Sequence, residues 1–197
     1  MKCFWAKIFM VLPLLIMLSQ CAPMTTNFYL PEAVGGKVVE AHCPPVESFI
    51  LFEKQGVIIG CQASSKTFDK ISITVTFEVP EGKVVALKGN KIYSLENDKV
   101  FSNATLEGRI WVSMGKTAEF PVDSLMMGKT EWKILKQVTL YSTTKHAYYI
   151  FSATLTVPDP DYFVLRMPDI QVNEIHVVLP KVKFVRSSKT YLGPLNC

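Results

Sequence analysis

Residues 69–80 read DKISITVTFEVP and place an apolar side chain at every second position. Successive side chains of a β-strand point to opposite faces, so this alternation predicts a strand with one buried and one polar face. Residues 146–158, HAYYIFSATLTVP, repeat the pattern. Pro80 and Pro158 end the two predicted strands, because proline cannot donate to a β-ladder. The predicted inward side chains are Ile71, Ile73, Val75, Phe77 and Val79 in the first strand, and Tyr149, Phe151, Ala153, Leu155 and Val157 in the second.

Shorter β-like segments surround these two at intervals of about ten residues, with turn residues between them. One hairpin turn is expected at residues 53–56, which end in glycine. A second is expected at Asn173-Glu174, because asparagine tolerates the left-handed conformation that such turns need. This spacing predicts an all-β chain, a single antiparallel β-sandwich of the immunoglobulin-like kind. Only residues 122–127 and 131–136 could be helical. Further strands are expected at residues 37–41, 84–87, 91–95, 105–113, 138–142, 162–167 and 182–186.

The amino terminus has the pattern of an export signal. Lys2 and Lys7 precede an apolar run of 11 residues, 8–18. A transmembrane helix needs about 20 apolar residues, so this run is too short to span a bilayer. A basic start followed by a short apolar centre predicts a secretory signal peptide.

The segment Leu18-Ser19-Gln20-Cys21 resembles the lipobox of bacterial lipoproteins. Leu18, Ser19 and Cys21 match that pattern, whereas Gln20 stands where a small residue is usual. The resemblance implies that Cys21 is the first mature residue, with diacylglycerol on its sulfur and an acyl chain such as palmitate on its amine. Ala22, in place of aspartate, implies the outer membrane, facing the periplasm. An unlipidated export signal is the alternative.

The chain therefore divides into three parts. Residues 1–20 are the expected signal peptide, and residues 21–46 a lipidated start, a tether and a first short strand. Residues 47–197 are the expected β-sandwich domain. Residues 162–184 are also similar to the tail of uncharacterised proteobacterial envelope proteins, a similarity that carries no function across.

Charge excludes one broad class of partner. The whole chain has a formal net charge of +4, with 21 basic and 17 acidic residues. Lys2 and Lys7 leave with the signal peptide, so 19 basic residues face 17 acidic ones in the remainder, a net charge of +2. That balance is too even to predict nucleic-acid binding.

Five cysteines have different expected fates. Cys3 leaves with the signal peptide and Cys21 carries lipid, which leaves Cys43, Cys61 and Cys197. Export to an oxidising compartment makes a disulfide the default fate of a pair. Cys43 with Cys61 is the preferred pair, because the expected hairpin at 53–56 folds the chain back between them. Pairing of Cys197 with either one stays open.

Catalytic and metal motifs are weak in this chain. Ser113-Met-Gly-Lys116 has the Ser-x-x-Lys spacing of penicillin-recognising enzymes, but it ends an expected strand, whereas that chemistry needs a helix start. His42, His146 and His176 are scattered without zinc-site spacing. We therefore expect no catalytic residue, no metal site and no cofactor.

Two functions of different class remain. The first is a non-enzymatic binding or structural protein, held to membrane lipid through Cys21, whose partner is another envelope protein or a glycan. Trp111, Tyr148 and Tyr141 are its candidate partner-binding residues, because exposed rings on a sandwich can stack on sugars or anchor a protein. These rings could instead lie beneath a loop, as part of the core.

The alternative function is a membrane-tethered hydrolase of cell-wall or polysaccharide substrate. It would use carboxylates such as Asp159, Asp161 or Asp169. Glycoside hydrolysis needs two carboxylates held about 5–10 Å apart in one cleft. The fold would have to bring these residues together.

Overall fold

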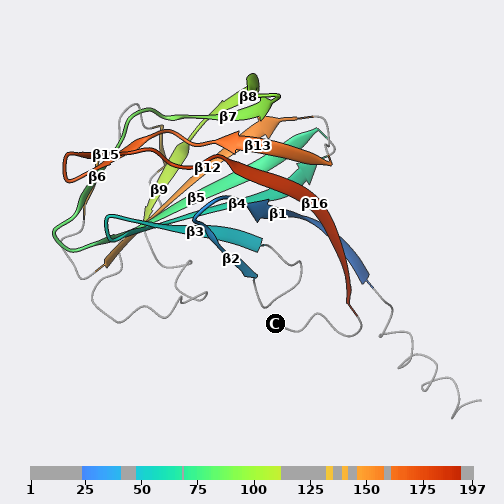
Figure 1. The fold of residues 1–197 in the computed structure, drawn as a ribbon, viewed down its shortest axis with the longest axis horizontal. Helices are drawn as coiled ribbons and strands as arrows, with labels where there is room; N and C mark the ends of the chain where they lie inside the picture. The colour runs from blue at the N-terminus through green and yellow to red at the C-terminus, as the bar shows by residue number, and fades with distance from the viewer. Residues whose placement is uncertain are drawn as a thin grey trace, which may run out of the picture.

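The strands form three antiparallel sheets that share one hydrophobic core (Figure 1). They are seen in a computed structural model of the chain. The predicted all-β class is confirmed, and the arrangement is consistent with a β-sandwich. The immunoglobulin-like subclass stays a prediction. The structure describes residues 24–40, 48–67, 69–111, 132–134, 139–141, 146–157 and 161–191.

The first sheet, called the β5 sheet, is built on the two long strands that the sequence predicts. β5 (Lys70–Pro80) and β12 (His146–Thr156) pair along their whole lengths. On the other side of β5 lies β4 (Val57–Thr67), which forms the expected hairpin with β3 (Ser48–Lys54). The remaining described strands of this sheet are β2 (Lys37–Glu40) beside β3, β9 (Glu107–Trp111) beside β12, and β10 (Trp132–Ile134) beside β9.

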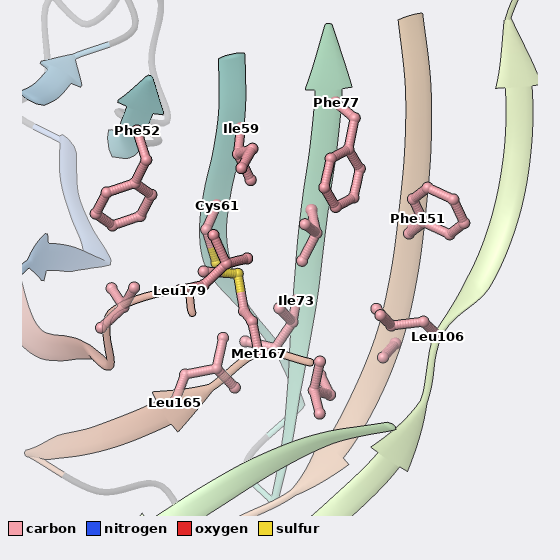
Figure 2. Close-up of a cluster of buried hydrophobic side chains, with 14 of the residues drawn as sticks. Phe52, Ile59, Cys61, Ile73, Phe77, Leu106, Phe151, Leu165, Met167 and Leu179 are labelled. Carbon is pink, nitrogen blue, oxygen red and sulfur yellow. The ribbon is translucent and has the colours of Figure 1, made fainter. Parts of the chain in front are cut away.

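One face of β5 and β12 forms the centre of the core. The inward residues of β5 are at most 2% exposed and those from Tyr149 to Val157 at most 6%, so the predicted alternation is confirmed in both strands. The rings of Phe77 and Phe151 meet edge to face, with centroids 5.7 Å apart. Figure 2 shows these two rings in the buried cluster, on neighbouring strands.

The second sheet, called the β16 sheet, covers the open face of this core. In Figure 2, Leu165 and Met167 come from this side and approach Cys61 and Ile73. Phe163 stacks on Phe184 with ring centroids 5.1 Å apart, so the sheet adds its own aromatic layer. In spatial order its described strands are β1 (Met24–Glu32), β16 (Val182–Tyr191), β13 (Tyr162–Arg166), β7 (Lys91–Glu96) and β8 (Lys99–Thr105).

The strand β1 lies within residues 21–46, where the sequence predicted a tether before the first short strand, which is β2. Residues 24–32 pair with β16 along the whole of β1, and Tyr29 is buried against Phe163. The polar start of this strand and Pro31 make it look like a linker in the sequence. An edge strand tolerates both features, because one side of its backbone makes no ladder.

Two further strands differ from expectation. The sequence did not predict β8. Its residues show no apolar alternation, because as an edge strand it exposes both faces at Lys99, Val100 and Phe101. β10 lies inside residues 131–136, which we expected could be helical. Pairing with β9 decides its conformation, since strand formation depends more on neighbours than on intrinsic propensity. The other helical candidate, 122–127, lies outside the described residues.

The third sheet, called the β6 sheet, closes one end of the sandwich. Its described strands contribute Val85, Leu140 and Ile170 to the core, each 0% exposed. Within the described ranges, no helix is long and apolar enough to cross a membrane. In spatial order the strands are β11 (Thr139–Tyr141), β6 (Val84–Leu87), β14 (Ile170–Val172) and β15 (Ile175–Val177).

Both predicted hairpin turns are confirmed. Gln55 and Gly56 have φ of 53° and 78°, and Asn173 and Glu174 have φ of 45° and 70°. Two successive left-handed residues match the twist of the flanking strands. The second turn is also bonded to the neighbouring strand β6, because Asn173 Oδ1 accepts a 2.7 Å hydrogen bond from the Val84 N–H.

Replacing Asn173 by alanine should lower the free energy of unfolding by about 1–3 kcal/mol. The variant loses the hydrogen bond to Val84 and puts a residue of low left-handed tolerance at φ 45°. Urea denaturation measures the loss. Asn173→Gly keeps the backbone freedom and removes only the side-chain bond, so its loss should be smaller. If both variants are as stable as the wild-type protein, this turn does not hold the sheet.

Candidate functional site

The predicted binding aromatics are only partly brought together. Trp111 in β9 lies directly opposite Tyr148 in β12, whereas Tyr141 belongs to β11 in the β6 sheet. Tyr148 is half-buried. Burial raises the pKa of Tyr148, and the charge and hydrogen bond of Glu78 raise it further. Tyr148 is therefore already engaged by its own sheet, and partner binding at these three residues stays a prediction.

A groove opens where two neighbouring strands of the β16 sheet separate, and we call it the β13 groove. β13 pairs with β7 only from Val164 to Arg166. Before Val164, the hairpin of β7 and β8 turns away through Asn97 and Asp98, which have φ of 48° and 63°. The resulting hollow has a volume of about 380 Å³. It lies between the tip of that hairpin and the start of β13.

The β13 groove has an apolar floor and aromatic walls. Leu95, Val157 and Phe163 line it and are each at most 5% exposed. Phe101 and Tyr162 also line it, yet are 51% and 58% exposed. Monomeric domains usually bury such rings, so a pair of exposed ones beside a hollow marks a candidate contact surface.

The rim of the β13 groove is acidic. Glu96, Asp98 and Asp161 line it, and none of its described lining residues is lysine or arginine. Lys181 Nζ lies 2.6 Å from Asp98 Oδ1. The hydrogen bond from Lys181, and then its charge, hold the pKa of Asp98 below its usual range. Asp98 therefore stays ionised at neutral pH.

The structure separates two of the carboxylates considered for hydrolysis. Asp161 precedes β13 and lies in the groove, whereas Asp169 follows β13 and lies 3.3 Å from His176. The five residues of β13 between them span roughly 16 Å. That distance exceeds the separation that glycosidase carboxylates need. Asp159 lies outside the described residues.

The remaining motif residues form no catalytic or metal cluster that the structure describes. Ser113, Lys116 and His42 lie outside the described residues. His146 begins β12, and His176 faces Asp169 on the edge of the β6 sheet. Among the described residues, no group of three histidine, cysteine, aspartate or glutamate side chains could hold a metal ion.

Cys61 lies in the core beside Met167 and Leu179 (Figure 2). It is a free thiol, 1% exposed, and burial raises its pKa to about 12. Its predicted partner Cys43 lies outside the described residues, so the pairing stays a prediction. The register does place Cys61 opposite Ile50, two residues from the point where the segment with Cys43 enters β3.

Non-reducing peptide mapping of protein taken from the envelope should recover a Cys43–Cys61 peptide. Such a bond would stabilise the fold by about 3 kcal/mol through loop closure. A thiol with a pKa of about 12 has almost no thiolate at neutral pH, so protein folded in a reducing compartment should keep Cys61 free. A peptide joining Cys197 to Cys43 or Cys61 would contradict the pairing.

The β13 groove is absent from the sequence predictions. The one usable signal was the dipeptide Asn97-Asp98, since both residue types favour left-handed turns. Recognising that turn would have placed β8 after it and Phe101 on an exposed edge. The contribution of Asp161 and Tyr162 depends on strand order in the sheet, which local sequence does not give.

Comparison of the chain with protein-family models, curated proteins and solved structures finds no match.

Proposed function

We propose that the chain is a lipid-anchored protein of the bacterial cell envelope whose β-sandwich binds another envelope component through the β13 groove. The observation that carries the binding role is the pair of exposed rings, Phe101 and Tyr162, beside a buried apolar floor. Aromatic anchors of this kind contribute much of the energy of protein interfaces. The partner would be another envelope protein or a glycan.

Two observations favour binding over hydrolysis. A general acid needs a carboxyl pKa raised towards neutrality, and Lys181 lowers that of Asp98. The second is the separation of Asp161 from Asp169 by the length of β13. The groove therefore has charges suited to holding a ligand, and Asp161 and Asp169, two of the carboxylates expected to act in hydrolysis, do not meet in it.

The anchor and the domain are close in the chain. The lipobox resemblance makes Cys21 the acylated residue, and β1 begins at Met24. Three residues of extended chain span at most about 11 Å. The sandwich would therefore sit at the membrane surface, and its partner would be a component found there.

Site-specific photo-crosslinking in intact envelopes tests this function. A benzophenone amino acid at Phe101, and separately at Tyr162, should give a discrete covalent adduct. The matched control is Val178, an apolar residue that is 65% exposed and does not line the groove. The same probe at Val178 should give no such adduct.

A probe at Trp111 separates the two candidate surfaces. Adducts at Trp111 without adducts at Phe101 or Tyr162 would move the binding site to the β9–β12 edge of the β5 sheet. Equal labelling at Val178 and at the groove would show that the contacts are unspecific. Absence of adducts at all sites, with hydrolysis of peptidoglycan by the purified protein, would overturn the binding function.

A further inference from the structure

We propose that the β13 groove takes an extended polypeptide segment carrying lysine or arginine. This inference rests on the proposed function, since it names the class of partner for the same groove. Three independent features of the groove carry it: one residue of β13 that is unpaired on its β7 side, carboxylates without an ion-pair partner, and two groups that already hold ammonium ions of the protein itself.

The residue with one unpaired side is Tyr162. The Arg186 N–H donates a 2.7 Å hydrogen bond to the Asp161 carbonyl, so the backbone polar groups of Asp161 point towards β16. Alternation along the strand then turns those of Tyr162 towards β7. Tyr162 pairs with Val185 of β16 on one side, but pairing with β7 begins only at Val164, so among the described strands Tyr162 has no ladder partner on the β7 side. An extended segment could add main-chain hydrogen bonds there, as in other β-augmentation sites.

The unpaired carboxylates are those of Glu96 and Asp161. Both line the groove, and the ion pairs of the described residues involve other carboxylates, those of Glu32, Glu40, Asp98 and Asp169. A neutral glycan could stack on Phe101 and Tyr162 but would leave both charges uncompensated. A cationic side chain compensates them, and its aliphatic stem can lie along the apolar floor.

Two groups of the groove already hold cations. The carboxylate of Asp98 binds Lys181 at 2.6 Å, and the Lys183 ammonium lies 5.3 Å from the centroid of the Tyr162 ring. Carboxylates and aromatic faces are the two kinds of group that attract ammonium and guanidinium ions. The groove therefore suits the charge and the shape of a basic strand, and opposes an acidic one.

Binding of short synthetic peptides to the detergent-solubilised full-length protein tests the inference. The probe is a capped hexapeptide of alternating lysine and valine, followed by fluorescence anisotropy. Glu96→Gln combined with Asp161→Asn keeps the shape and removes two charges, and should weaken binding about tenfold at low salt. The matched control is the double substitution Glu174→Gln and Glu81→Gln, two exposed carboxylates that do not line the groove, and binding should not change.

Three comparisons separate the outcomes. N-methylation of alternate amides in the probe should weaken binding, because it removes the donors that Tyr162 needs. If a glutamate–valine hexapeptide binds equally well, or a neutral N-acetylglucosamine hexamer binds better, the proposal of a cationic segment is wrong. Crosslinked adducts at Phe101 would in that case still support the proposed function. Failure of every probe together with absence of those adducts would overturn both.

Discussion

Replacing Phe151 by alanine is expected to lower the free energy of unfolding by about 3–5 kcal/mol. The side chain is 1% exposed and lies at the centre of β12, opposite Val75 of β5 (Figure 2). Truncation removes a large apolar surface and leaves a cavity, because the surrounding strands cannot collapse into it without breaking their ladders. Urea denaturation at constant m-value measures the loss.

The same strand supplies a control. Thr154 lies on β12 but faces outward and is exposed, so Thr154→Ala should change stability by about 1 kcal/mol or less. Phe77→Ala combined with Phe151→Ala should lose less than the sum of the single variants. The edge-to-face pair of these rings predicts a coupling of about 0.5–1.5 kcal/mol. A loss below 1 kcal/mol for Phe151→Ala would contradict a shared core between the sheets.

The centre of the fold could be predicted because its residues carry their own pattern. β5 and β12 are flanked by other strands on both sides, so only the alternation of their side chains decides which face is buried. That alternation is visible in DKISITVTFEVP without any knowledge of neighbours. The left-handed residues at Gln55-Gly56 and Asn173-Glu174 are equally local, since asparagine and glycine favour those conformations intrinsically.

The edges of the fold could not be predicted in the same way. β1, β8 and β10 each lie at one side of a sheet, where a strand need not have a continuous apolar face. β1 is held chiefly by its nine-residue register with β16, a strand more than 150 residues later in the chain. A pairing at that sequence separation leaves no signal in the local sequence.

The candidate site depends on long-range order too. Phe101 comes from β8 and Tyr162 from β13, while Val157 directly follows β12, and strand order brings them to one groove. The sequence predicted aromatic binding residues as a class, but it selected Trp111, Tyr148 and Tyr141 from outward positions in expected strands. Whether a ring is free to bind a partner depends on what lies beside its strand. Tyr148 is an example, because Glu78 on the neighbouring strand β5 forms a hydrogen bond with it.

Replacing Cys21 by serine is expected to abolish acylation and to move the protein from the membrane fraction to the soluble fraction. Each buried acyl CH₂ contributes about 0.8 kcal/mol, and stable anchoring takes two or more signals, so loss of the sulfur-linked chains removes most of the attachment. Metabolic labelling with a palmitate analogue and fractionation of membranes measure both effects. Cys3→Ser is the matched control, because it removes a thiol from the expected signal peptide and should leave labelling unchanged. Retained labelling in the Cys21→Ser variant would contradict the lipobox resemblance. Loss of labelling with retained membrane attachment would instead mean that a bound partner holds the sandwich at the membrane. Substitution of Phe101 and Tyr162 in the Cys21→Ser variant should then release the protein from the membrane fraction.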